Sequence, residues 1–319
     1  MTGKILVTGG CGFIGSNFLK IMVPKYKQTK FLNIDKLTYA GKSENLIKIN
    51  HFKNYSFSKL DICNYLKLKK IIKNFKPDVV VHFAAESHVD NSIKSPGEFI
   101  KSNIFGTYNV LRSINKKIFL IHISTDEVFG HVINNKSFNE KTKFNPRSPY
   151  SASKASADHL VSAWNSTYGY KSTIVNCCNN FGPNQDKEKF IPVIINNIFN
   201  NKKIPIYGNG KQKREWIFVD DFISSIDFII SKNLTKENFL IGSGIRFENK
   251  KFVKKIIEIF KKYLNYDETK IKLVRVRDRP GHDKEYKVDS SKIRRLGWKS
   301  KTNIVSDLLK TINYYKSNL

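Results

Sequence analysis

A glycine-rich segment directly after the first apolar run constrains the fold of this chain more than any other feature. Residues 5–7 (ILV) are followed by residues 8–15 (TGGCGFIG), where a helical pattern begins. Glycines at this spacing permit a tight turn, close approach of the backbone to a pyrophosphate, and close packing of the helix. The helix N-terminus then faces the phosphate charge. We predict a dinucleotide-binding turn with Gly9, Gly12 and Gly15 as its glycines.

Short apolar runs recur along the first half of the chain, separated by segments long enough for crossover helices. Strands are expected at residues 5–7, 31–34, 79–83, 118–123 and 172–175. Runs that are apolar on both faces and alternate with helices are typical of a parallel sheet covered on both sides. The predicted fold class is α/β: a Rossmann-type, doubly wound parallel sheet with a smaller C-terminal substrate-binding domain.

The domain boundary is expected near residue 180, because proline and glycine punctuate the pattern after about Phe181. Residues 1–180 would form the NAD-binding domain and residues 181–319 the second domain. A segment around residues 219–241 is expected to return to the first domain, so the boundary is not a single cut.

An acidic residue, Asp35, ends the second predicted strand, 20 residues after Gly15. A carboxylate there accepts hydrogen bonds from the adenosine ribose hydroxyls and disfavours a 2′-phosphate, so we predict NAD rather than NADP. Asp61 and Ile62 follow the next strand and are expected to touch the adenine. Asp35 alone would fit a solvated turn acid, but together with the glycines it indicates a cofactor site.

Tyr150 and Lys154 form a Tyr-x-x-x-Lys pair (YSASK) whose side chains share one helical face. A phenol with a pKa near ~10 is a poor base at neutral pH. A neighbouring ammonium, helped by the positive nicotinamide, is expected to lower that pKa, and Lys154 also to bind the nicotinamide ribose. Alone the pair fits an ordinary amphipathic helix. Downstream of the glycine turn it predicts a catalytic base.

Two adjacent acids, Asp126 and Glu127, follow the strand at residues 118–123, where α/β sheets hold their ligands. Acids at a buried strand end are costly unless they are used or solvated. A surface turn is the alternative. The Tyr150 and Lys154 pair about 25 residues later makes a catalytic pair the better interpretation.

The net charge of +29 admits two explanations. A polyanion-binding surface is one, but the lysines are dispersed along the chain rather than clustered with aromatic residues. The other is a compositional drift in which Lys, Asn and Ile rise together. We favour the drift and expect no nucleic-acid partner, although a positive field would attract a sugar-nucleotide diphosphate.

Targeting and metal signals are weak in this sequence. The chain runs from its first residues straight into a strand, so we expect no signal peptide. We also expect no membrane span, because no apolar stretch approaches ~20 residues. Cys11, Cys63, Cys177 and Cys178 lack zinc-type spacing, so no metal site is predicted, and reduced thiols in a cytoplasmic protein are expected.

At these motifs the sequence resembles the extended short-chain dehydrogenase/reductase family and, within it, the dTDP-glucose 4,6-dehydratases of the route to activated rhamnose. The resemblance covers nearly the whole chain, and its motifs lie at residues 8–16, 35–41, 84–90, 123–128, 148–155, 205–208 and 278–283. The acids Asp126 and Glu127 are its specific part, because nucleotide-sugar epimerases of the same fold usually carry uncharged residues there.

The resemblance implies a role for each catalytic residue. Tyr150 would remove the sugar O4 proton while NAD takes the C4 hydride, with Thr125 holding that hydroxyl. The C4 ketone acidifies the C5 proton, which Glu127 would remove. Asp126, protonated, would give its proton to the departing C6 hydroxyl. Return of the hydride to C6 yields a 4-keto-6-deoxy sugar and makes the enzyme a hydro-lyase.

Binding residues are implied in the same way. The cofactor set comprises Gly9, Gly12, Phe13, Ile14, Gly15, Asp35, Lys36, Leu37, Thr38, Asp61, Ile62, Ala84, Ala85, Ser102, Tyr150, Lys154 and Asn180. The substrate set comprises Ser87, Thr125, Asn179, Glu188, Lys189, Arg214, Arg279 and His282. Cationic Arg214 and Arg279 suit a diphosphate.

Four departures from the family pattern bear on the substrate. Phe129 and Phe181 stand where the family usually has Tyr, and Cys178 replaces a usual Ser. Leu240 replaces an Asn that helps to bind the nucleotide, so UDP-glucose stands beside dTDP-glucose as a possible substrate.

Two other functions remain alternatives: a nucleotide-sugar 4-epimerase, and a non-catalytic NAD- or RNA-binding regulator. Family members usually pair through two helices, so we expect a homodimer.

Overall fold

The computed structural model describes residues 3–318, apart from the side chain of Glu268. Met1 and Thr2, which belong to the stretch where no signal peptide is expected, lie outside the described residues. The strands are β1 (Gly3–Thr8), β2 (Thr29–Asp35), β3 (Tyr55–Lys59), β4 (Val79–His82), β5 (Phe119–Thr125), β6 (Lys171–Cys177), β7 (Asn179–Phe181), β8 (Ile204–Tyr207), β9 (Lys213–Phe218), β10 (Asn238–Ile241), β11 (Arg246–Glu248) and β12 (Leu273–Val276).

The helices alternate with these strands through the first half of the chain. The α-helices are α1 (Phe13–Lys25), α2 (Tyr65–Phe75), α3 (Val89–Lys94), α4 (Pro96–Phe99), α5 (Gly106–Ser113), α6 (Pro149–Tyr168), α7 (Phe190–Phe199), α8 (Val219–Ser231), α9 (Asn249–Leu264), α10 (Ser291–Arg295) and α11 (Ile304–Lys316). Short 3₁₀ helices are η1 (Ser43–Ile49), η3 (Asp126–Phe129) and η4 (Glu268–Lys270), and a π-helical stretch, η2 (Ile100–Phe105), joins α4 to α5.

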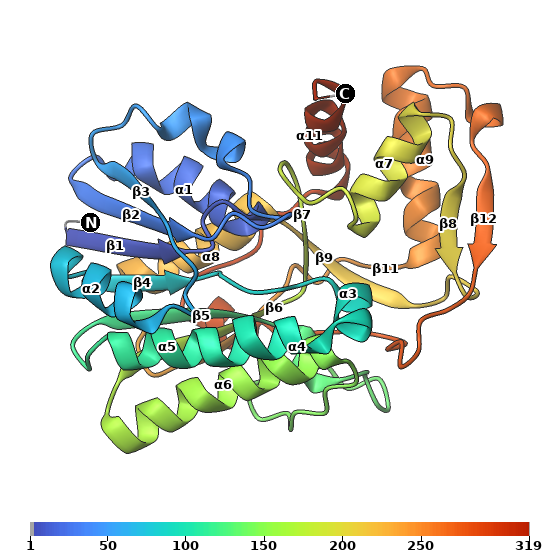
Figure 1. Cartoon of the computed structure of the whole chain (residues 1–319). Helices are drawn as coiled ribbons and strands as arrows, with labels where there is room; N and C mark the ends of the chain where they lie inside the picture. Colours follow the sequence, from blue (N-terminus) through green and yellow to red (C-terminus); the bar gives the residue numbers. More distant parts are fainter. Residues whose placement is uncertain (1–2, 319) are drawn as a thin grey trace.

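A seven-stranded sheet forms the larger lobe, in the order β10-β6-β5-β4-β1-β2-β3 (Figure 1). All of its pairings are parallel. The chain turns from one half of the sheet to the other between β1 and β4, and ligands bind at such a switch point in doubly wound sheets. The predicted fold class is confirmed. The five strands expected from the sequence are all present, and β3 and β10 extend the sheet beyond them.

Successive residues of each central strand face opposite sides of the sheet. Ile5 and Val7 of β1 belong to a core shared with α1 and α8, whereas Leu6 belongs to a core shared with α2, α5 and α6. On β5, Ile121 and Leu120 divide in the same way. This two-residue period explains the continuous apolar runs, because helices cover both faces.

The smaller lobe, on the right of Figure 1, has its own apolar core. Isoleucines of α7, aromatic residues of β9 and α9, and apolar residues of α11 pack together there. The chain then returns to the larger lobe: α8 packs against α1, and β10 pairs in parallel with β6. The chain therefore crosses between the two lobes more than once. The carboxyl ends of the central strands border the space between the lobes.

Other expectations concern membranes and cysteines. Within residues 3–318, none of the helices combines the length and apolar character needed to cross a bilayer. Cys11, Cys63, Cys177 and Cys178 are all free thiols.

A buried carboxylate joins the start of α8 to a late segment of the chain. One oxygen of Asp221 accepts hydrogen bonds from the Lys301 amide at 2.8 Å, the Thr302 amide at 3.0 Å and the Thr302 hydroxyl at 2.8 Å. It also accepts one from the hydroxyl of Ser300. Removal of this carboxylate would leave several donors in the interior without a partner, which is costly.

We expect Asp221→Ala to lower the free energy of unfolding by about 2–4 kcal/mol, because a charged acceptor shared by several buried donors is lost. Urea unfolding followed by circular dichroism measures this change. The matched control is Asp220→Ala, since Asp220 occupies the same helical turn but is exposed. Its expected effect is below about 0.5 kcal/mol, and equal effects of the two substitutions would contradict the assignment.

Candidate functional site

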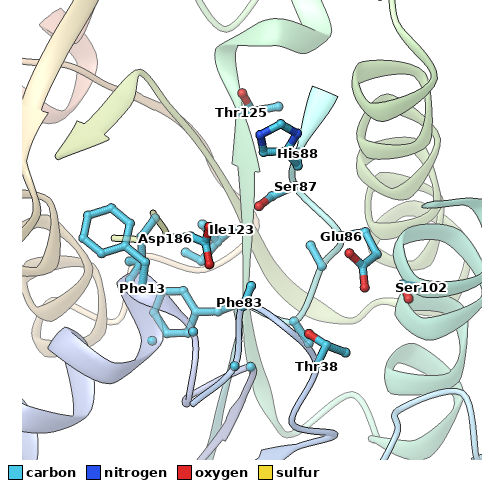
Figure 2. A pocket seen from close by; sticks show the side chains of 18 of the residues that line it. Phe13, Thr38, Phe83, Glu86, Ser87, His88, Ser102, Ile123, Thr125 and Asp186 are labelled. Atoms are coloured by element: carbon cyan, nitrogen blue, oxygen red, sulfur yellow. The ribbon is translucent and has the colours of Figure 1, made fainter. Parts of the chain in front are cut away.

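A pocket of about 300 Å³ opens at the carboxyl ends of β1, β2, β4, β5 and β6. Figure 2 shows side chains from separate segments around it, among them Phe13, Thr38, Glu86 and Ser102. Phe13 begins α1, Thr38 follows β2, Glu86 follows β4, and Ser102 belongs to η2. The pocket therefore lies at the switch point between β1 and β4 and extends along the ends of β5 and β6.

The glycine turn after β1 forms one wall of this pocket. A Cβ atom on Gly15 would lie 2.3 Å from the carbonyl oxygen of Gly9, and one on Gly9, whose φ is +72°, would lie 2.5 Å from the amide nitrogen of Ala84. A Cβ on Gly12 would meet only the Gly9 oxygen, at 3.4 Å. Gly9 and Gly15 are thus required by backbone packing, whereas Gly12 leaves space on the pocket side. This is the arrangement that a pyrophosphate needs.

Asp35 ends β2 beside the glycine turn and is held by two backbone amides. Its Oδ2 accepts from the amide of Cys11 at 2.9 Å, and its Oδ1 accepts from the amide of Leu37 at 2.8 Å. Burial raises the pKa of Asp35, and these two hydrogen bonds oppose the shift. Leu37 adopts a left-handed conformation, with φ 58°. Because each carboxylate oxygen has a second lone pair, Asp35 keeps the capacity to bind ribose hydroxyls. The glycine turn and Asp35 together fit NAD.

Polar side chains connect the segments on the opposite wall. The Lys36 ammonium lies 3.6 Å from the Glu86 carboxylate and donates to the Ser102 hydroxyl at 3.3 Å. The Lys189 ammonium donates to the carbonyl oxygen of Ser87 at 2.7 Å. Lys189 precedes α7 of the smaller lobe, so this bond joins the two lobes across the pocket.

Helix α6 begins with a strong cap that fixes the first turn. The Ser148 hydroxyl accepts from the Ser151 amide at 3.0 Å, the Ser151 hydroxyl accepts from the Ser148 amide at 3.0 Å, and Pro149 occupies the first turn. Tyr150 lies in this turn, and Lys154 lies one turn later. Both line the pocket, as the Tyr-x-x-x-Lys pattern predicts for residues on one helical face.

The electrostatics of Tyr150 differ from the expectation. Burial raises the pKa of Tyr150 well above its usual value, the Glu127 carboxylate raises it further, and a hydrogen bond with Thr125 lowers it. The Lys154 ammonium instead donates to the carbonyl oxygen of Ile123 at 2.8 Å. Lys154 was predicted to lower the pKa of Tyr150. Among the protein's own groups, burial raises this pKa instead, because burial penalises the charged phenolate.

The two adjacent acids lie where β5 passes into η3. The Thr125 hydroxyl accepts from the Glu127 amide at 3.2 Å and so caps this short helix. Asp126 is 1% exposed, and its Oδ2 is buried without a hydrogen-bond partner. Burial raises the pKa of Asp126 well above its usual value, and Glu127 raises it further. These shifts favour the neutral form of Asp126, which is one of the residues that line the pocket.

Glu127 is surrounded by more positive charge than Asp126. Burial raises the pKa of Glu127, while Arg214, Lys189 and Arg279 lower it. Two like carboxyls this close do not both ionise easily, and the environment decides which one does. The cations favour the charge on Glu127 and the proton on Asp126.

The two arginines come from the smaller lobe and are bound to protein groups. The Arg214 guanidinium donates to the carbonyl oxygen of Asp283 at 2.9 Å and lies over the Tyr286 ring. The Arg279 guanidinium lies 2.6 Å from Asp90 and over the Tyr207 ring. Neither arginine lines the pocket, although both influence Glu127. Loss of the Asp90 contact would be needed for Arg279 to bind a diphosphate with its full set of donors.

Most residues predicted for the site line this one pocket. Those that do are Gly9, Gly12, Phe13, Ile14, Gly15, Asp35, Lys36, Thr38, Asp61, Ile62, Ala84, Ala85, Ser87, Ser102, Thr125, Asp126, Glu127, Tyr150, Lys154, Asn179, Asn180 and Lys189. The predicted residues outside the lining are Leu37, Glu188, Arg214, Arg279 and His282. The carboxylate of Glu188 lies 3.7 Å from His88, and His282 Nδ1 lies 2.6 Å from Asp278.

The family departures mostly lie away from the pocket. Phe129 packs with Phe138 and Phe144, and Phe181 is fully buried in the core of the smaller lobe. Leu240 is 1% exposed on β10, in the core of the larger lobe. Its side chain packs in that core and does not line the pocket, and its effect on base recognition stays a prediction. Among these departures, Cys178 alone lines the pocket.

Several lining residues were not assigned to the cofactor or substrate sets by the sequence analysis, although some of them lie in its motifs and Cys178 was named as a departure. They are Ile34, Tyr39, Ala40, Gly41, Leu60, Phe83, Glu86, His88, Ile123, Ser124, Cys177, Cys178, Gln185 and Asp186. Many of them lie at or just after the predicted strand ends, which is the signal that could have identified them. A buried cluster behind the pocket, containing His122 and Asp158, was also missed, because a polar residue inside a strand or helix has no local signature.

Among residues 3–318, no group of three or more His, Cys, Asp or Glu side chains is arranged to hold a metal ion.

Comparison with known proteins agrees with the geometry. The family model of GDP-mannose 4,6 dehydratase matches residues 6–311. A dTDP-glucose 4,6-dehydratase from Escherichia coli is 40% identical over 99% of this chain and 94% of its own. The crystal structure of DesIV, a dTDP-glucose 4,6-dehydratase from Streptomyces venezuelae with NAD and TYD bound, superimposes with a TM-score of 0.92, at 34% identity, over 99% of this chain and 97% of that one.

A related enzyme class shares the fold. The UDP-glucose 4-epimerase of Thermotoga maritima has a TM-score of 0.88 at 26% identity, over 99% of both chains. The fold alone does not separate the two classes, but the greater identity to the dehydratases does. The full-length match at 40% identity means that this chain belongs to the dTDP-glucose 4,6-dehydratase family of extended short-chain dehydrogenases/reductases.

Proposed function

We propose that this protein is an NAD-dependent hydro-lyase that converts dTDP-glucose or UDP-glucose to the 4-keto-6-deoxy sugar. The observation that carries the proposal is the acid pair at the end of β5. Asp126 has a buried oxygen without a partner and a raised pKa, and it stands beside Glu127, whose charge three cations favour. An oxidation alone needs no such pair, whereas the elimination of water needs an acid and a base.

The glycine turn, Asp35 and the segments after β3 and β4 would hold NAD. Gly12 would face the pyrophosphate and Asp35 the adenosine ribose. Asp61, Ile62, Ala84, Ala85 and Asn180 line the same pocket, which supports their assignment to the cofactor. When bound, NAD accepts the hydride from C4 and later returns it to C6, so it is not consumed.

Tyr150 and Lys154 of α6 would prepare the sugar for oxidation. Tyr150 takes the proton from O4 of the glucose, and the Thr125 hydroxyl holds that oxygen in place. Because burial opposes ionisation of Tyr150, the phenolate requires positive charge close to it. Lys154 supplies one such charge from the next turn of the helix, and the positively charged nicotinamide ring supplies another.

The acid pair would then remove water. The C4 ketone acidifies the C5 proton, and the Glu127 carboxylate takes that proton. Asp126 gives its own proton to the C6 oxygen, which leaves as water. The neutral state of Asp126 and the ionised state of Glu127 are both required, and the burial and cations around them support these states.

The smaller lobe would bind the sugar nucleotide. Ser87, Asn179 and Lys189 line the pocket, and the Lys189 ammonium is already positioned by Ser87. Glu188, Arg214, Arg279 and His282 lie outside the pocket lining and would reach the diphosphate and base if the substrate drew the two lobes together. Residues 1–180 with the return segment 219–241 would then be the NAD-binding domain, and residues 181–319 the sugar-nucleotide domain. The separate apolar core in the smaller lobe supports this division.

The four free thiols support a reducing compartment, and we place the protein in the cytoplasm.

The direct test is incubation of the purified protein, without added NAD, with dTDP-glucose and separately with UDP-glucose. We expect a product lighter by one water in the mass spectrum, formed faster from dTDP-glucose because the relatives act on that nucleotide. Conversion of glucose to galactose would instead indicate an epimerase. No change in either sugar by a protein shown to contain NAD would reject the proposed reaction.

A second prediction concerns the base. We expect Glu127→Gln to keep NAD bound but to slow dehydration by about 10²–10⁴-fold, because the amide has the same shape and cannot accept the C5 proton. Mass spectrometry measures dehydration, and absorbance of the released cofactor measures NAD content. The control is Glu258→Gln on α9, which removes an exposed carboxylate far from the pocket. Undiminished turnover by Glu127→Gln would reassign the base.

A third prediction concerns assembly. We propose a homodimer through α5 and α6, which pack side by side along one side of the larger lobe (Figure 1). In these helices and the adjoining η2, Ile100, Phe105 and Tyr168 are 46%, 57% and 57% exposed. Sedimentation at micromolar concentration should show a dimer, and Ile100→Lys combined with Phe105→Lys should yield a monomer. Ile47→Lys, at another exposed apolar residue on η1, should leave the dimer intact. A wild-type monomer would refute the assembly.

A further inference from the structure

The ammonium of Lys154 is buried behind the catalytic pocket. Lys154 is 3% exposed, and its Nζ donates to the carbonyl oxygen of Ile123 at 2.8 Å. Within the part of the chain that the structure describes, no carboxylate lies within ion-pair distance of this Nζ. A buried ammonium is costly unless a nearby negative charge balances it. The buried Lys154 ammonium therefore requires a negative charge that lies beyond an intervening side chain.

His122 is that intervening group. Its Nε2 lies 3.5 Å from Lys154 Nζ and 3.2 Å from Oδ1 of Asp158. His122 comes from β5, whereas Asp158 lies one turn after Lys154 on α6, so the three side chains meet between the strand and the helix. His122 and Asp158 are both fully buried, at 0% exposure. Burial lowers the pKa of His122 well below its usual value, which makes the imidazole neutral.

The other oxygen of Asp158 is clamped to the sheet. Its Oδ2 accepts from the Ser124 hydroxyl at 2.8 Å and from the Asn176 amide group at 2.9 Å. The same Asn176 nitrogen donates to the carbonyl oxygen of Thr125 at 3.1 Å. Asp158 is therefore fixed relative to Thr125, and Lys154 on the same helix is fixed with it.

We propose that Asp158, acting across His122, is the positioning residue for Lys154: its carboxylate balances the buried ammonium and holds it at the Ile123 carbonyl with its remaining N–H bonds toward the pocket. This inference rests on the proposed function, in which Lys154 binds the cofactor ribose and supports Tyr150. His122 Nε2 lies near both charges without a hydrogen bond to Oδ1 of Asp158, which has no hydrogen-bond partner among the described residues, so the carboxylate acts on the ammonium through space. None of the sequence motifs includes His122 or Asp158.

The groups that face the ammonium decide how it responds to pH. They are Tyr150 and Asp158 from α6, His82 from β4, His122 from β5 and Cys177 from β6. Burial lowers the Lys154 pKa, and Asp158 raises it. Burial raises the Cys177 pKa to about 12, so this thiol stays neutral over the working range. Removal of the Asp158 charge therefore lowers the pKa of Lys154 further, and the ammonium loses its proton at a lower pH.

The test is calorimetric titration of NAD into cofactor-free protein between about pH 7 and about pH 9, with Asp158→Asn as the variant. A shift of one pKa unit corresponds to about tenfold in affinity at a pH where the ammonium is lost. We expect the variant to lose about tenfold in NAD affinity at the upper pH relative to the lower one, and the wild type to lose less than about threefold. The basic limb of kcat/KM should move to lower pH by about one unit.

Two further variants separate charge from packing. Asp307→Asn removes another buried carboxylate, on α11, which is bound to the Asn303 amide and to Lys310. It should alter thermal stability and leave the pH dependence of NAD affinity unchanged. His122→Gln replaces one neutral side chain with another and leaves the Asp158 carboxylate in place, so its NAD affinity should keep the pH dependence of the wild type. Asp158→Ser, which also removes the carboxylate, serves as the decisive variant if Asp158→Asn does not fold.

The outcomes are distinguishable from failure of the proposed function. A wild type that binds NAD but dehydrates neither sugar nucleotide refutes the proposed reaction, while the pH dependence of NAD affinity still tests the positioning role. A pH dependence of NAD affinity in Asp158→Asn that matches the one in Asp307→Asn would show that Asp158 only stabilises the fold, and would overturn the inference.

Discussion

The parallel pairing of β1, β4, β5 and β6 is the constraint on which the rest of the structure depends. Because these strands run the same way, their carboxyl ends lie at one edge, and each strand delivers its next residues to the same space. β1 delivers the glycine turn and β2 delivers Asp35. β5 delivers Thr125, Asp126 and Glu127. The chemistry of the pocket is therefore a consequence of sheet topology rather than of proximity in the sequence.

The second constraint is electrostatic, and it explains why two lobes are needed. A buried acid pair stays protonated unless cations stabilise one carboxylate, and the larger lobe alone supplies little positive charge beside Glu127. Arg214, Lys189 and Arg279 all come from beyond residue 181, in β9, before α7 and after β12. The smaller lobe thus lowers the pKa of Glu127 and contributes Lys189 to the lining of the pocket.

Much of the fold could be predicted from the sequence, because the two patterns that indicate it, apolar runs and glycine spacing, are local. Apolar runs identified five strands of the seven-stranded sheet, and the glycine spacing located the turn after β1. β3 lies at the edge of the sheet, and its residues are exposed or only partly buried. It therefore lacks the apolar run that identified the other strands. The candidate site was less complete: the surroundings of Arg214, which include Tyr286 and Asp283, bring together residues some 70 positions apart. No local pattern predicts such a contact.

The same argument explains why, among the protein's own groups, the pKa of Tyr150 is raised rather than lowered. Spacing on a helix predicts which side chains are neighbours, but it gives neither the depth of burial nor the direction of an ammonium's hydrogen bonds. Lys154 shares a face with Tyr150, yet its ammonium donates to the Ile123 carbonyl and lies 3.5 Å from His122 Nε2, which is itself 3.2 Å from the Asp158 carboxylate. A lysine held in this way keeps a fixed position whether or not the phenol is ionised. In the proposed reaction, ionisation of Tyr150 would then depend on what occupies the pocket, and proton removal would be coupled to the presence of an oxidised, positively charged cofactor.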